Sequence, residues 1–374
     1  MKIQSDERPG GRVLSGLQFN PGQICSIQHF TMVSKLPEEV DSAVTVTYRS
    51  AGLGVWGTLI RAIGMPLEKI ALTANSAQVS GQGQYRQAFK ITFEEGWAAP
   101  FRVLTARSGI AWFLQYSIMG FTFQIADRTL SKALNVDQFQ VSQLKKEVTE
   151  EDEEDRIEED RTNNIHEIYE TRDKDLTYNA RYGSKMILAP LMATSFESLV
   201  SNKAEGIRFY GPEKFTKIEA SKLIKQNIIK KAAGPAYVAN VGRNFLMCSS
   251  AFIWTPFFFA KLPEDYKTST NLFWFGLLGN WTANLAAVQC QSLWGRSLDY
   301  MAVDGGRPIN YSSVIREGLK KEGFAAFFTP TKYCSRVLMN CPAQGTIPWF
   351  YNSVLPIAEP RVKGMATGVY NSMF

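Results

Sequence analysis

The fold is decided by the stretch Gly52–Asp127, which reads GLGVWGTLIRAIGMPLEKIALTA (residues 52–74), then YRQAFKITFEEGWAAPFRVLTARS (residues 85–108), and ends FTFQIAD (residues 121–127). In its first part Gly54 and Gly57 lie one helical turn apart, and Pro66 follows nine residues after Gly57. Small residues at this spacing let helices approach closely, and an internal proline kinks a helix. We therefore expect a closely packed, proline-kinked membrane helix over about residues 46–74.

The second part of the stretch predicts two further helices. Residues 82–96 place Tyr85, Phe89 and Phe93 four residues apart on one face, which indicates an amphipathic helix lying along a membrane surface. Residues 103–126 carry no charge except Arg107 and are long enough to cross a membrane. The stretch thus forms one unit of long helix, short helix and long helix.

Two looser copies of this unit follow. The second begins YGSKMILAPLMATSFESLV at Tyr182, and the third begins NLFWFGLLGNWTANLAAVQCQSLWGR at Asn271. Glycines that close the short amphipathic segments stand at Gly96, Gly234 and Gly323. Three units of this kind, at about residues 46–135, 180–265 and 270–356, predict an all-α chain with six long helices.

Composition narrows the function classes. The chain has 374 residues, 45% of them hydrophobic, and a net charge of +6, but no basic tract interleaved with aromatic residues, so a nucleic-acid partner is not expected. The five cysteines form no CxxC pair, and there are only two histidines. We therefore expect no metal site, no protein-bound cofactor and no enzymatic activity.

Three segments lie outside the repeats. Residues 1–45 mix glycine, proline and charges and are predicted to form an N-terminal arm, and residues 357–374 form a short C-terminal tail. Residues 145–176 are dominated by acids and interrupt the repeats. This acidic insert is either a solvated loop or a docking segment for a basic partner.

The motifs resemble the mitochondrial carrier family, whose three tandem repeats each carry a Pro-x-acid-x-x-base turn, an amphipathic matrix helix and an acid-Gly pair. The resemblance covers about residues 46–356 and rests on Pro66-Leu67-Glu68, Glu95-Gly96, Phe101-Arg102 and Glu322-Gly323. It implies six transmembrane helices in three carrier-type repeats with short matrix-side amphipathic helices. It also implies a multi-pass protein of the mitochondrial inner membrane.

The family's matrix gate is degenerate in this chain. In carriers the acids and bases of the three turns pair and close the cavity, which is the basis of alternating access. The nine corresponding positions here are Pro66, Glu68 and Ala71, then Ser195, Glu197 and Val200, then Val288, Cys290 and Leu293. All three gate bases are missing and two acids remain, so Glu68 and Glu197 are expected to be neutralised or to find new partners. The second gate also lacks its acids.

Other positions gain a possible role from the resemblance. Arg107, Arg243 and Arg336 stand on even-numbered long helices, where carriers bind anionic substrates, although they could instead cap helix carbonyls or meet lipid phosphate. Phe101-Arg102 resembles a site for cardiolipin or another phospholipid.

Two functions follow as hypotheses. The first is a carrier-fold protein that has lost transport and acts as an accessory subunit of a mitochondrial inner-membrane assembly, such as cytochrome c oxidase or another respiratory-chain complex. Its partners would be membrane lipids and other inner-membrane subunits. The alternative is a divergent transporter that exchanges an anionic metabolite across the inner membrane.

Overall fold

The computed structural model describes residues 37–74, 83–139, 176–219, 233–303 and 309–373, and at Glu38, Val103, Arg107 and Leu176 the backbone alone. These residues belong to one compact unit, Leu36–Phe374. Residues 1–36, most of the acidic insert and residues 220–232 of the second amphipathic segment lie outside the described part.

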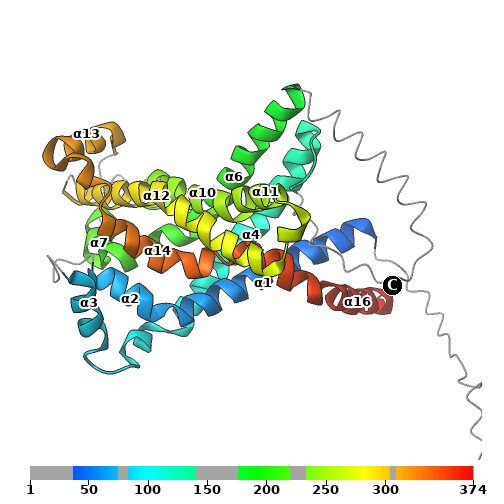
Figure 1. Cartoon of the computed structure of the whole chain (residues 1–374), viewed down its shortest axis with the longest axis horizontal. Coiled ribbons are helices and arrows are strands. Elements are labelled where there is room, and N and C mark those ends of the chain that lie inside the picture. Colours follow the sequence, from blue (N-terminus) through cyan, green and yellow to red (C-terminus); the bar gives the residue numbers. More distant parts are fainter. Residues whose placement is uncertain (1–36, 75–82, 140–175, 220–232, 304–308, 374) are drawn as a thin grey trace, which may run out of the picture. The chain divides into compact units, whose positions relative to one another are not determined.

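Every regular element in the described ranges is helical, so the all-α prediction is confirmed (Figure 1). The first repeat contains α1 (Glu38–Ile63), α2 (Met65–Ala74), α3 (Gln84–Phe93), η1 (Ala99–Val103) and α4 (Ala106–Leu134). The second contains α6 (Leu176–Tyr210), α7 (Pro212–Glu219), α10 (Tyr237–Ser249), η2 (Ser250–Trp254) and α11 (Thr255–Ala260). The third contains η3 (Glu264–Tyr266), α12 (Ser269–Val303), α13 (Tyr311–Glu322), η4 (Gly323–Ala326), α14 (Pro330–Gln344), α15 (Ile347–Trp349), η5 (Phe350–Val354) and α16 (Leu355–Met373).

No helix in these ranges combines the length and the apolar character needed to cross a membrane. Two boundaries also differ from the predicted ones. The first helix begins at Glu38, inside the segment assigned to the arm, and α16 continues to Met373, through the segment assigned to the tail. Residues 357–373 are helical although Pro360 interrupts the hydrogen bonding of that helix.

The long helices pack as a closed ring in chain order. Helix α4 packs along α1 and α6, α10 along α6 and α12, and α14 along α12, and α14 returns to α1 and α2 (Figure 1). The close approach predicted from Gly54 and Gly57 is present, because a Cβ at Gly57 would lie 2.3 Å from the ring of Tyr116 on α4. The three glycines at 96, 234 and 323 all have positive φ (98°, 77° and 62°), which explains why the repeats need glycine there.

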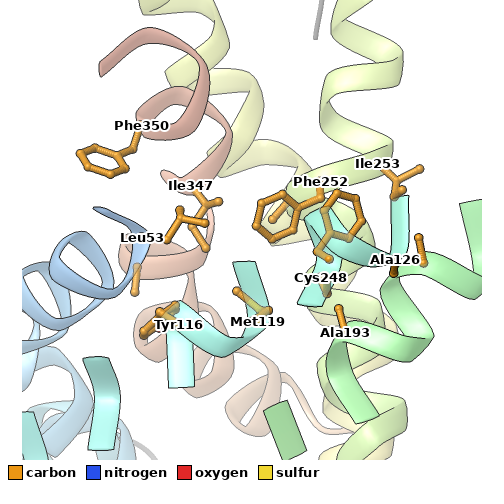
Figure 2. Close-up of a cluster of buried hydrophobic side chains, with 14 of the residues drawn as sticks. Leu53, Tyr116, Met119, Ala126, Ala193, Cys248, Phe252, Ile253, Ile347 and Phe350 are labelled. Atoms are coloured by element: carbon orange, nitrogen blue, oxygen red, sulfur yellow. The ribbon is translucent and has the colours of Figure 1, made fainter. Parts of the chain in front are cut away.

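The centre of the ring is filled by apolar side chains (Figure 2). We call these residues the central cluster: Leu53, Tyr116, Met119, Phe123, Ala126, Ala189, Ala193, Cys248, Ala251, Phe252, Ile253, Ala343, Ile347, Phe350 and Leu355. They come from α1, α4, α6, α10, η2, α14, α15, η5 and α16. Phe252 stacks on Phe123 with ring centroids 4.6 Å apart, so η2 and α4, which are separated by α6 in the ring, touch at this level.

Candidate functional site

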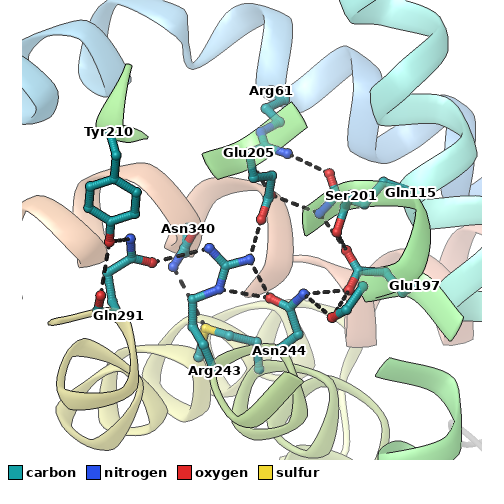
Figure 3. Close-up of polar contacts among 12 residues, drawn as sticks. Arg61, Gln115, Glu197, Ser201, Glu205, Tyr210, Arg243, Asn244, Gln291 and Asn340 are labelled. Atoms are coloured by element: carbon teal, nitrogen blue, oxygen red, sulfur yellow. Dashed lines mark hydrogen bonds and ion pairs between the residues drawn. The ribbon is translucent and has the colours of Figure 1, made fainter. Parts of the chain in front are cut away.

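A buried polar cluster joins side chains of α1, α4, α6, α10 and α12 (Figure 3). Gln115 on α4 is at its centre and donates from Nε2 to Glu197 Oε1 at 2.7 Å and to Glu205 Oε1 at 2.9 Å. Arg61 on α1 donates to Gln115 Oε1 at 3.0 Å and pairs with Glu205 at 3.4 Å. Arg243 on α10 pairs with the other oxygen of Glu205. One glutamate of α6 thus holds cations from two other helices.

Glu197, which sequence comparison placed in the degenerate gate, is fully buried and is bonded by neutral donors. Ser201 donates to Oε1 at 2.7 Å and Ser198 to Oε2 at 3.2 Å, and Asn244 also donates to Oε2. Within the described ranges no cationic group lies within ion-pair distance of this carboxyl. Hydrogen bonds therefore replace the missing base in the second repeat.

Glu68 acquires new bases. Its carboxylate pairs with Arg208 of α6 and lies 3.9 Å from Nε of Arg61. The side chain at Ala71, where the carrier pattern would place the base, is fully buried. Glu68 therefore has new basic partners, Arg208 and Arg61, in place of the base missing at Ala71. Sequence analysis missed Arg208 and Glu205, although their spacing from each other on one face of α6 was a usable signal.

The other gate positions form no ion pair in the described part of the chain. Ser195 is partly exposed and Val200 is exposed on α6. In the third repeat Val288 is buried and Cys290 half-buried, while Leu293 packs in the apolar cluster around Trp294. The third repeat meets the polar cluster through Gln291, whose side-chain oxygen accepts from Arg243 at 3.1 Å.

A second set of charges lies beyond the central cluster, toward the start of α1. Lys185 on α6 is fully buried, pairs with Asp127 on α4 at 2.7 Å and lies 3.9 Å from the ring centre of Phe139. Arg49 on α1 pairs with Glu359 on α16 at 2.8 Å. Sequence analysis expected both gates to be dismantled and overlooked Asp127 and Lys185. The sequence held a signal for this pair, because Asp127 is the acid that ends the apolar run FTFQIAD, residues 121–127.

The central cluster separates the two sets of charges on three consecutive helices. On α1, Leu53 comes between Arg49 and Arg61. On α4 the intervening residues are Met119 and Phe123, and on α6 they are Ala189 and Ala193. The ring therefore has charges at two levels and packed apolar side chains between them.

A pocket of about 570 Å³ opens on the side of the polar cluster, between α2, α6, α12, η4 and α14. Its lining includes four cations and two acids: Arg208, Arg296, Lys332, Arg336, Asp299 and Glu322. Arg336 is 5% exposed. With the Asn340 amide turned so that its oxygen faces Arg336, that oxygen accepts from Nη2 at 2.6 Å and from Nε at 3.2 Å.

The charged groups at the rim of the pocket affect one another. A hydrogen bond from Arg296 lowers the pKa of Glu322, which is otherwise exposed. Burial lowers the pKa of Lys332, and the nearby positive charge of Arg296 lowers it further. The pocket lining carries net positive charge, because four of its charged groups are cations and two are acids.

The structure does not present the three predicted substrate arginines as one open set. Arg243 is 2% exposed and held by Glu205, and Arg336 lines the pocket. Arg107 is the second residue of α4, and its side chain lies outside the described part. At the predicted phospholipid site both Phe101 and Arg102 are exposed, and Arg102 pairs with Glu95.

No group of His, Cys, Asp or Glu side chains suited to a metal ion occurs among the described residues. Comparison with protein-family models, with curated proteins and with solved structures finds no match for this chain.

Proposed function

We propose that this chain is a carrier-like membrane protein that has lost transport and serves as an accessory subunit of a mitochondrial inner-membrane assembly. A respiratory-chain complex such as cytochrome c oxidase is the first candidate. The observation that carries the proposal is the central cluster, in which Phe252 contacts both Phe123 of α4 and Tyr351 of η5 between two levels of charge. A carrier needs a solute path through this region, and packed aromatic rings leave none.

The distribution of polar and apolar side chains supports a membrane environment. On α12, Trp274 and Trp281 are 62% and 50% exposed, and Leu278 is 50% exposed, while Asn280 and Asn284 are buried. The same arrangement occurs on α6, where Phe196 is exposed and Glu197 is buried. Apolar side chains outside and polar side chains inside suit helices surrounded by lipid or by other membrane proteins.

Buried ion pairs hold the repeats together in this closed arrangement. Glu68–Arg208 joins the first repeat to the second, and Glu205 ties α6 to α1 and α10. Arg61, Glu68, Glu205 and Arg243 are almost fully buried and Arg208 is 20% exposed, so separating the pairs would leave charges unpaired at a cost of about 3–5 kcal/mol each. A carrier breaks and remakes pairs of this kind in every cycle, so the proposal rests on the central cluster.

The proposed partners follow from the same residues and from the sequence. The exposed apolar faces would contact lipid and neighbouring subunits, and a phospholipid such as cardiolipin would bind near Phe101 and Arg102. A basic partner would bind the acidic insert, residues 145–176. We propose no catalytic role and no cofactor.

The test is the assembly itself. A tagged chain is expressed in its own cells, mitochondria are solubilised in mild detergent, and the tagged complexes are separated by native electrophoresis. We expect comigration with one respiratory complex and co-purification of its subunits in stoichiometric amounts. A chain that migrates alone, with no such subunits, would contradict the proposal.

The alternative, a divergent anion transporter, is favoured by one observation, the cationic pocket with the buried Arg336. Reconstitution of the purified chain in liposomes tests it. Saturable uptake of labelled phosphate or malate that is lost in Arg336→Ala, and kept in Arg316→Ala on the exposed face of α13, would support transport. Absence of uptake for both solutes would leave the accessory role.

A further inference from the structure

We propose that the pocket between α12, η4 and α14 binds the phosphate group of an organic phosphate, with Lys332 and Arg336 as its two principal ligands. This inference concerns a binding site in the third repeat and does not depend on whether the chain transports. It also differs from the set Arg107, Arg243 and Arg336, because the proposed ligands share one repeat.

The charge balance of the pocket carries the argument. Each acid at the pocket already has a base, since Asp299 pairs with Lys214 and Glu322 pairs with Arg296. A second cation of the pocket, Arg208, is also paired, with Glu68.

Two cations remain without a carboxylate. Lys332 Nζ donates to the carbonyl oxygens of Ala325 and Ala326, each at 3.1 Å, and Arg336 has the amide oxygen of Asn340. Within the described ranges no carboxylate lies within ion-pair distance of either group. Two positive charges that line one pocket match the charge of a phosphate monoester.

The burial of Arg336 makes its lack of an acid significant. The side chain is 5% exposed, and a buried guanidinium without a counter-charge is strongly unfavourable. The carrier pattern would place an acid at Cys290 and a base at Leu293 on the neighbouring α12, and this chain has neither. A bound anion would supply the missing negative charge.

The shape and lining favour an organic phosphate over a small inorganic anion. Guanidinium and ammonium groups together suit the tetrahedral oxygens of phosphate. The pocket of about 570 Å³ exceeds the space that a phosphate group fills, and Leu72, Val288 and Met339 add apolar walls. The organic part could belong to a soluble phosphate ester or to a phospholipid headgroup, which share the same phosphate chemistry.

Binding is tested with inorganic phosphate as the probe. The purified full-length chain is freed of lipid in detergent and titrated with phosphate, with chloride at matched ionic strength as the reference. We expect saturable stabilisation against heat and a dissociation constant at least roughly tenfold weaker in Arg336→Gln and in Lys332→Gln. Lys320→Gln, on the exposed face of α13, is the matched control and should bind like the wild type.

Lys332→Gln keeps the test decisive if Arg336→Gln does not fold. Lys332 is partly exposed, and its substitution leaves the buried Arg336 in place. Phosphorus analysis of the chain before lipid removal then separates the sources. Phosphorus in the organic extract, reduced in Lys332→Gln, indicates a lipid headgroup, whereas phosphorus in the aqueous extract indicates a soluble ester. Absence of saturable phosphate binding, or equal binding by both variants and the wild type, would overturn the proposal.

Discussion

At the scale of single residues, buried charges have partners that the carrier resemblance does not predict. Glu68 has no base at Ala71 and pairs instead with Arg208, and Lys185 pairs with Asp127 where no pair was expected. Buried charges persist only when paired or well hydrogen-bonded. Each of these buried acids therefore marks a contact between helices that the fold requires.

Lys185 gives the sharpest stability prediction. Lys185→Met should lower the free energy of unfolding by about 3–5 kcal/mol, because Asp127 is left buried without its cation. Chemical denaturation in detergent measures the change. Lys132→Met, on the exposed side of α4, should be within about 0.5 kcal/mol of the wild type. Equal stability of the two variants would show that the buried pair is absent.

A pH dependence is expected at the pocket rim. The hydrogen bond from Arg296 lowers the pKa of Glu322 in the folded chain. The Arg296–Glu322 pair therefore stabilises the fold above the unfolded pKa of Glu322, and this stabilisation is lost as the pH falls through the lower, folded pKa. The protection of the α13 amides, measured relative to their intrinsic exchange rate at each pH, should therefore fall below about pH 4. In Glu322→Gln the protection should already be lower at neutral pH and should vary less with acidification. An identical pH profile in both proteins would exclude this pair.

At the scale of elements, two π-helical segments shape the centre of the ring. Segment η2 (Ser250–Trp254) contributes Phe252 to the central cluster, and η5 (Phe350–Val354) contributes Phe350. A π segment contains one residue more than the corresponding α turn and is wider than it. Each segment thus places an aromatic ring in the central cluster.

Deleting Ser353 from η5 tests this role. The deletion should restore α-helical hydrogen bonding and narrow this turn, which displaces Phe350 from its stack on Trp56 and Tyr351 from its contact with Phe252. We expect a loss of more than about 2 kcal/mol in unfolding free energy, because aromatic packing in the central cluster is lost. Ser353→Ala, which keeps the chain length, should change the free energy of unfolding by less than about 1 kcal/mol. Similar values for both would show that the wide turn is dispensable.

The elements were largely predictable from the sequence and their contacts were not. Helix periodicity acts locally, so the all-helical class could be predicted from the sequence, and the glycines at 96, 234 and 323 mark positions of positive φ. The partners of Glu68 and Glu205 depend on which faces of distant helices meet, and a single sequence does not contain this information. The helical ends at Glu38 and Met373 were missed because Pro37 and Pro360 were read as signs of irregular structure.

At the scale of the whole molecule, the ring of helices is closed at its centre. The central cluster contains a natural reporter, Cys248, whose side chain is 1% exposed, and α14 carries Cys334, which is exposed. A working carrier would open this region at least transiently, because its solute must pass there.

The rate of thiol labelling at these two cysteines therefore tests the account most directly. The folded, membrane-reconstituted chain is exposed to a small maleimide, and each site is quantified by mass spectrometry. We predict rapid labelling of Cys334 and no labelling of Cys248 until the chain is unfolded. Labelling of Cys248 in the folded chain at a rate comparable to that of Cys334 would contradict a closed centre, and with it the loss of transport.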